Sequence, residues 1–243
     1  VPHFHNSQPK PDGIDNSHMV FYDSFYDEDE VYHIGDDITS EAYNSSVRAP
    51  AQKFGDYHCD ASKLLINNTL KSIVKYQEEN DIEFDFIIFN GDVVDHDELM
   101  FKSYNMSIES DEYLFRDFKK YFNDTPIYTV LGNHDSFPYA QISSRASGFR
   151  NLYEWNEELR AELWSGNGWL PADKYDQIKS HYAGFTVNTP RNLKIIALNS
   201  NPYYQKNFYT YWNMTENYDT FEMSKFLIDE LAEAEKAGQQ AWI

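Results

Sequence analysis

The chain has 243 residues, enough for one large α/β domain with a buried core. It carries 40 acidic and 20 basic residues, which gives a formal net charge of −20. A surface of this sign repels a phosphate backbone, so the composition argues against a nucleic-acid partner. The sequence contains no run of about 18 apolar residues, and it therefore predicts no transmembrane segment.

The first 60 residues differ in composition from the rest of the chain. They are rich in Asp, Tyr, His, Ser and Pro and show no sustained apolar period. We expect residues 1–60 to form an extended N-terminal loop region and residues 61–243 to form the regular part of the same catalytic domain. Irregular segments of this length in compact domains are often functional or disordered.

Helical and strand patterns alternate from Ser62 onward. Apolar residues at helical spacing follow Ser62, which can act as an N-cap, and the apolar run 84–89 predicts a strand buried on both faces. A helix over 111–122 and a buried strand over 126–131 are expected next.

The second half of the chain continues this alternation. We expect helices over 149–164 and 172–180, a buried strand over 193–198, and a last helix capped by Thr220 and closed by Gly238. Another apolar run begins at residue 241. The alternation predicts an α/β layered sheet with parallel pairing as the default.

Two polar loops follow the first two predicted strands. One carries Gly91-Asp92, with Asp95-His96-Asp97 close behind, and the other carries Gly132-Asn133-His134-Asp135. In sheets of this kind, catalytic groups collect at the carboxyl ends of the strands. Gly-Asp alone is common at turns, but Gly-Asn-His-Asp behind a buried strand is much more specific, and the two together predict a metal site.

Each residue type in these loops has a chemical role that it can fill. The carboxylate of Asp92 can bridge a pair of divalent cations, and Asn133 offers a neutral amide oxygen to one of them. His134 is placed to protonate a departing alkoxide, and Asp135 can orient its imidazole. His96 is a second candidate for contacting phosphate, because flanking carboxylates favour its cationic form.

Several features concern the cellular route and the surface. Five Asn-x-Ser/Thr sequons predict a secreted or vacuolar, N-glycosylated protein, and they lie at Asn44, Asn67, Asn105, Asn123 and Asn213. Cys59 is the only cysteine, so the sequence offers no internal disulfide. The aromatic residues over 203–212 either line an apolar substrate cleft or pack in the core, and packing is the simpler interpretation.

The motifs resemble the acid sphingomyelinase-like branch of the calcineurin-type metallophosphoesterases, and most closely its fungal members. The stretches that carry the resemblance are Phe54-Gly55-Asp56-Tyr57-His58-Cys59-Asp60, Asn90 to Asp97, Leu131 to Ser136, His181-Tyr182-Ala183-Gly184 and Ile228-Asp229-Glu230-Leu231. The resemblance implies a sandwich of two packed sheets flanked by helices, of which this chain would hold the first half.

The resemblance also implies a centre of two divalent metal ions, usually Zn²⁺, and a phosphodiester substrate. That substrate is a sphingomyelin-type lipid headgroup at a membrane surface in some members and a nucleotide-type molecule in others. It implies that Asp92 bridges the ions, that Asn133 binds one, and that His134 and His96 serve the phosphate and the leaving group. A cysteine like Cys59 is paired with an upstream cysteine in the family, but none precedes it here.

Two departures from the family pattern bear on function. The first family motif, Asp-x-His, appears here as Val1-Pro2-His3, so His3, or alternatively His5, is the candidate ligand. The later Gly-His and Gly-His-x-His motifs do not occur, so we expect the metallophosphoesterase domain to be incomplete at its C-terminal end. The alternatives to a phosphodiesterase are a phosphatase or endopolyphosphatase and a catalytically silent phosphate-binding or interaction protein.

Overall fold

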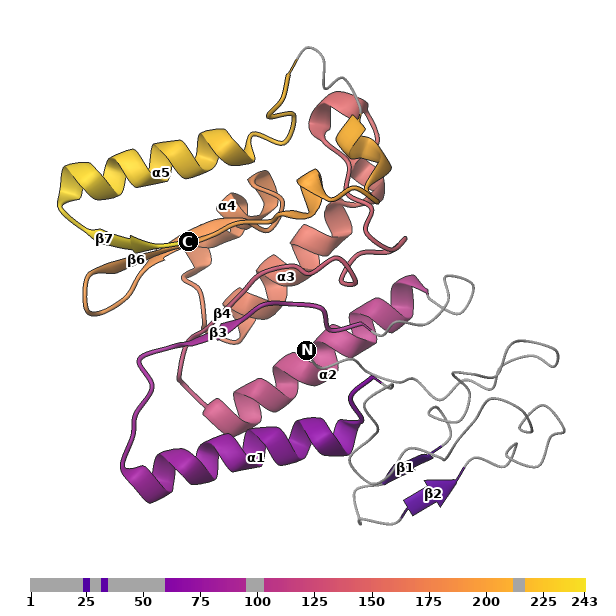
Figure 1. Cartoon of the computed structure of the whole chain (residues 1–243), viewed down its shortest axis with the longest axis vertical. Coiled ribbons are helices and arrows are strands. Elements are labelled where there is room, and N and C mark those ends of the chain that lie inside the picture. The colour runs from indigo at the N-terminus through magenta and orange to yellow at the C-terminus, as the bar shows by residue number, and fades with distance from the viewer. Residues whose placement is uncertain (1–23, 27–31, 35–59, 95–102, 212–216) are drawn as a thin grey trace, which may run out of the picture. The chain divides into compact units, whose positions relative to one another are not determined.

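The computed structural model describes residues 24–26, 32–34, 60–94, 103–211 and 217–243 (Figure 1). The chain divides into two compact units: residues 1–82 with 93–121, and residues 83–92 with 122–243. Among the described helices, none is both long and apolar enough to cross a membrane. The predicted site loops belong mainly to the second unit.

Two long helices lie among the described residues of the first unit. Helix α1 spans Lys63–Asn80, and the Ser62 hydroxyl accepts a hydrogen bond from the Leu65 amide at 3.2 Å, which confirms the predicted N-cap. Helix α2 spans Tyr104–Phe122 and begins well before the predicted residue 111. The Ser103 hydroxyl accepts a hydrogen bond from the Met106 amide at this start, and the buried positions that follow, Ser107 and Asp111, are polar and give no apolar period.

Two short strands occur within the predicted N-terminal loop region. Strand β1 (Ser24–Tyr26) pairs antiparallel with strand β2 (Tyr32–Ile34). Some regular structure therefore exists before residue 60. Most of the loop region lies outside the described residues, and the boundary between 1–60 and 61–243 stays a prediction.

Two small sheets lie in the described part of the second unit. Strand β3 (Ile87–Phe89) pairs parallel with strand β4 (Ile127–Thr129), as predicted. The other sheet has the order β5-β6-β7, with bounds Phe185–Asn188, Leu193–Ala197 and Gln240–Trp242. β6 pairs parallel with β7 but antiparallel with β5, because the short connection between β5 and β6 can join only antiparallel strands.

Helices pack on both faces of the β5-β6-β7 sheet. Ile196 of β6 packs in a buried cluster with Phe226 of α5 (Met223–Ala237), which lies along β6 and β7 in Figure 1. On the opposite face, Phe185 of β5 lies 5.5 Å, centroid to centroid, from Trp164 of α3 (Glu154–Gly166). The other helical segments that the structure describes are α4 (Tyr175–Ser180) and the 3₁₀ turns Arg145–Ser147, Arg150–Leu152, Ala172–Lys174, Asn201–Tyr203 and Phe208–Tyr211.

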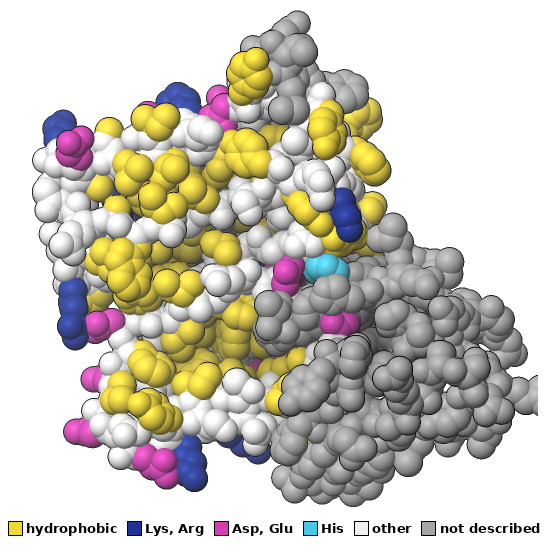
Figure 2. Space-filling view, in the orientation of Figure 1, with side chains coloured by type: hydrophobic (Ala, Val, Ile, Leu, Met, Phe, Trp, Pro, Cys, Tyr) yellow, Lys and Arg dark blue, Asp and Glu magenta, His cyan; other side chains and the backbone are white. Residues whose placement is uncertain are grey.

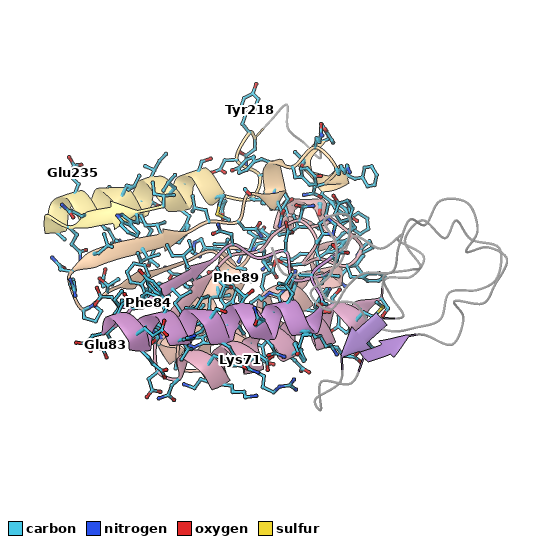
Figure 3. All side chains as sticks on the ribbon, turned by 60° about the horizontal axis from the view of Figure 1, so that its bottom comes forward. Lys71, Glu83, Phe84, Phe89, Tyr218 and Glu235 are labelled. Atoms are coloured by element: carbon cyan, nitrogen blue, oxygen red, sulfur yellow. The ribbon has the colours of Figure 1, made fainter. Side chains whose placement is uncertain are left out.

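The ends of α5 test the predicted caps. Gly238 closes the helix with φ of 63°, as predicted. Thr220 is not the N-cap; instead the Asp219 carboxylate accepts from the Ser224 and Lys225 amides at 2.9 and 2.8 Å. An ionised carboxylate is a stronger acceptor for free helix amides than a hydroxyl. The side chains of Glu235, within α5, and of Tyr218, which precedes the helix, project outward in Figure 3.

Burial of the predicted strands differs between β3 and β4. All three residues of β4 are buried, as predicted. Ile88 in β3 is 51% exposed, so the prediction of a strand buried on both faces is wrong there. Ile88 lines an apolar groove shared with Tyr128, Leu198 and Trp242. Figure 2 shows hydrophobic side chains exposed on the face that it presents.

Glu157 of α3 has a buried carboxylate that lies next to an arginine. It is 1% exposed, and its carboxylate lies 3.4 Å from the Arg150 guanidinium. Burial raises the pKa of Glu157 from 4.5 to about 7, against the opposing effect of Arg150. At pH values between these two pKa values, the folded protein binds more protons than the unfolded chain. In this range the ionisation of Glu157 therefore lowers the free energy of unfolding by roughly 1 kcal/mol for each unit by which the pH rises.

We expect Glu157→Gln to remove this contribution. The variant should gain stability relative to the wild type between pH 5 and pH 8, measured as the free energy of unfolding in denaturant at both pH values. Equal pH slopes for the two proteins would contradict a raised pKa at this position.

Candidate active site

The loop after β3 holds an aspartate in a left-handed backbone conformation. Gly91 has φ of 75° and Asp92 has φ of 58°. A non-glycine residue in this region costs energy and persists where its surroundings hold it. The turn places the Asp92 side chain directly beyond the carboxyl end of the strand, as the sequence predicts.

The loops after β3 and β4 approach each other closely. A Cβ atom added at Gly91 would lie 2.3 Å from the Gly132 amide nitrogen, and one added at Gly132 would lie 2.1 Å from Asp92 Oδ1. Neither distance can be accommodated without moving the backbone or the carboxylate. Both glycines are therefore required by this approach, and the parallel pairing of β3 with β4 brings the two loops to the same edge.

Asp135 joins the two loops. Its Oδ2 atom accepts hydrogen bonds from the Asp92 amide and from the Gly132 amide, both at 2.7 Å, and the residue is 1% exposed. Asp92 Oδ1 in turn accepts from the His134 amide at 2.9 Å. These three bonds fix the relative positions of the two loops. The predicted orientation of the His134 imidazole by Asp135 stays a prediction.

Asn133 and His134 both lie against Tyr139. The Asn133 side-chain amide donates to the Tyr139 hydroxyl at 2.9 Å, and the ring of His134 lies 4.7 Å from the Tyr139 ring. The Tyr139 hydroxyl is also 3.1 Å from that of Tyr204. Burial, together with the hydrogen bond to Tyr204, raises the pKa of Tyr139 to about 12, so the phenol keeps its proton at neutral pH.

Comparison with known proteins identifies the family. Residues 54–230 match the model of the calcineurin-like phosphoesterase family, a span that includes both site loops. The chain belongs to this family. The α/β layered fold predicted from the sequence is therefore confirmed as a metallophosphoesterase fold. Members of this family use a centre of two divalent metal ions.

Relatives of this phosphoesterase chain include named phosphodiesterases. It is 31% identical over 195 residues to a "Sphingomyelinase phosphodiesterase C" of Dictyostelium discoideum, and 31% identical over 197 residues to a human "Acid sphingomyelinase-like phosphodiesterase 3b". It is 30% identical over 200 residues to a human "Cyclic GMP-AMP phosphodiesterase". These alignments cover 79–80% of the chain and 39–40% of the relatives. The particular likeness to fungal members stays a prediction.

The described residues fit part of a phosphoesterase metal centre. Among them, no hydrogen bond reaches Asp92 Oδ2 or Asn133 Oδ1, which leaves one carboxylate and one amide oxygen for a cation. No group of three His, Cys, Asp or Glu side chains within the described ranges could hold a metal ion. The other predicted site residues, His3 and His96, lie outside those ranges.

Sequence reasoning missed the residues that hold the Gly132–Asp135 loop. The side-chain amide of Asn201 donates to the Gly132 carbonyl, and that of Asn156 donates to the Asp135 carbonyl, each at 2.9 Å. Both asparagines lie far along the chain in segments with no motif. Tyr139 lies close behind the loop in sequence, and an aromatic residue at that place is a signal that the sequence does contain.

Proposed function

We propose that this protein hydrolyses phosphodiesters with the help of divalent metal ions. The observation that carries the proposal is the clamped pair of loops, in which Asp135 fixes the backbone of Asp92 and Gly132 within a family of phosphoesterases. A site held in this way is preorganised, as catalysis of phosphoryl transfer requires. We propose Zn²⁺ as the metal.

The residues take distinct roles in this proposal. Asp92 and Asn133 supply oxygen ligands, with His3 as a further ligand outside the described residues. The bound ions would supply an activated water and neutralise the phosphoryl oxygens. His134 is 9% exposed, and its shielded position suits a group that passes a proton to the departing oxygen. We assign His96 to phosphate or leaving-group contact and Asp135 to support of His134.

The names of the relatives support a substrate class. Two of them name sphingomyelin-type phosphodiesterases, so we propose a sphingomyelin or related phospholipid headgroup at a lipid surface. A cyclic dinucleotide is the second candidate, because another relative is named for cyclic GMP-AMP. Both are phosphodiesters, so the same metal chemistry serves either.

The test is a comparison of metal content and turnover in the complete protein. We expect metal bound to the wild type, with turnover of a chromogenic phosphodiester and of either sphingomyelin or cyclic GMP-AMP. Asp92→Ala should lower both metal content and turnover, because it removes a ligand. His134→Ala should lower turnover by about 10²–10⁴-fold while metal content stays close to that of the wild type.

The control and the contrary outcomes are distinct. Asp173→Ala removes an exposed carboxylate from the surface and should behave as the wild type in both measurements. Hydrolysis of phosphomonoesters or polyphosphate alone would favour a phosphatase or endopolyphosphatase. Absence of bound metal and of all turnover would refute the hydrolase and favour a phosphate-binding or interaction protein.

We also propose that the protein is N-glycosylated and follows the secretory route. Asn105 and Asn123 are exposed, as an attached glycan requires. Asn67 is half-buried, and its side chain bonds to the Tyr113 hydroxyl, so it is a poorer acceptor. A mass that does not change on removal of N-linked glycans from the natively produced protein would contradict this proposal.

A further inference from the structure

We propose that Tyr139 is a positioning residue that holds the Asn133 side chain with its amide oxygen directed to the metal ion. The inference rests on the proposed function, because it concerns the same metal site. No motif in the sequence singles out Tyr139. The contacts of its hydroxyl and of its ring carry the argument.

The first step is the polarity of the asparagine amide. A side-chain amide has one oxygen that can bind a cation and one NH₂ group that cannot. Rotation of the amide group by half a turn exchanges the oxygen and the NH₂ group, so a neighbouring group must select one of the two orientations. In the structure the NH₂ group donates to the Tyr139 hydroxyl at 2.9 Å, and this contact leaves the oxygen as the end available to a cation.

The second step is the polarity of the phenol. The Tyr139 hydroxyl lies 3.1 Å from the Tyr204 hydroxyl, and either oxygen could donate. When Tyr139 donates to Tyr204, its own oxygen is left to accept from Asn133. The reverse direction would let Tyr139 donate to the Asn133 oxygen and turn the NH₂ group to the metal. The NH₂ group of Asn133 lies on the Tyr139 oxygen in the structure, which agrees with the first direction, and the proposal therefore assigns Tyr204 the role of acceptor.

The third step is the local geometry that keeps Tyr139 in place. The Ala140 amide donates to the Asn133 carbonyl at 3.0 Å and closes the backbone turn between the two residues. The ring of Tyr139 lies 4.7 Å from that of His134, so its two ends contact different residues of the motif. The hydroxyl acts on the proposed ligand Asn133, and the ring acts on His134.

The expected size of the effect follows from this arrangement. Residues that orient a metal ligand without touching the metal typically change affinity by about 10–100-fold when they are replaced. Tyr139→Phe removes the hydroxyl and keeps the ring beside His134. It should therefore weaken metal affinity by about tenfold or more.

The experiment measures Zn²⁺ affinity by competition with a chelator on the metal-stripped protein. We compare the wild type with Tyr139→Phe and with Tyr204→Phe, and expect both to bind Zn²⁺ more weakly, with the larger loss in Tyr139→Phe. Tyr153→Phe is the matched control, because Tyr153 and Tyr209 form a second pair of tyrosine hydroxyls, 3.2 Å apart. This control should match the wild type.

A double-mutant cycle separates positioning from general loosening of the loop. In an Asn133→Ala background, Tyr139→Phe should produce no further loss of Zn²⁺ affinity, because the side chain that it positions is gone. Wild-type affinity in Tyr139→Phe, or an undiminished loss in the Asn133→Ala background, would overturn the inference. If Asp92→Ala weakens Zn²⁺ binding in the same assay while Tyr139→Phe does not, the inference fails and the proposed function stands. If Asp92→Ala has no effect either, both fail.

Discussion

Replacing Asp135 with alanine is expected to lower the free energy of unfolding by about 2–6 kcal/mol and to abolish metal binding. The carboxylate accepts from the Asp92 and Gly132 amides, and both donors lose their acceptor in the variant. A buried donor left without a partner costs about 1–3 kcal/mol. Denaturant unfolding measures the first effect, and metal content of the purified protein measures the second.

Two variants make this result specific to the clamp. Asp135→Asn keeps one oxygen acceptor near the two amides and should lose less stability than Asp135→Ala. Asp173→Ala removes an exposed carboxylate and should stay within about 0.5 kcal/mol of the wild type. Asp135→Ala unfolding at the wild-type denaturant concentration would show that the carboxylate does not hold the two loops together.

The sequence predicts which helices and strands form better than it predicts their boundaries. The apolar period of a segment reflects which of its side chains are buried, so it locates the helix that begins after Ser62 and the strands that end near Leu131 and Leu198. It fails at the start of α2, because the first buried positions of that helix, Ser107 and Asp111, are polar and form no apolar stripe. It also fails at Ile88, because the sequence pattern does not distinguish an apolar side chain that lines an exposed groove from one that is buried in the core.

In the site, too, the sequence predicts features that depend on a local motif but not contacts between residues that are distant along the chain. The two loop motifs predict that Asp92 and the residues from Asn133 to Asp135 gather at one sheet edge, and parallel pairing of β3 with β4 places them there. The sequence does not predict that Asp135 accepts from two backbone amides, because one of them is 43 positions away. The Asn156 and Asn201 contacts depend on tertiary structure in the same way.

Gly132→Ala is expected to displace the Asp92 carboxylate and to abolish metal binding and turnover. The added Cβ atom would lie 2.1 Å from Oδ1, 2.4 Å from Cγ and 2.6 Å from the amide nitrogen of Asp92. Rotation of the side chain relieves the first two contacts but not the third, which involves backbone. The loops must therefore separate, and this movement would break the bonds from Asp135 Oδ2 to both amides. Metal content, turnover and denaturant unfolding together measure the outcome.

Gly166→Ala is the matched control for this change. A Cβ atom at Gly166, the last residue of α3, would meet nothing within 4 Å, so the same added methyl group should leave metal content and turnover unchanged. Alanine also restricts the unfolded chain more than glycine, so stability should be equal or slightly higher. If Gly132→Ala binds metal as the wild type does, the space beside Gly132 accommodates a methyl group, and the 2.1 Å contact between the added Cβ atom and Asp92 Oδ1 does not occur. The clamp formed by Asp135 would then not be what preorganises the site.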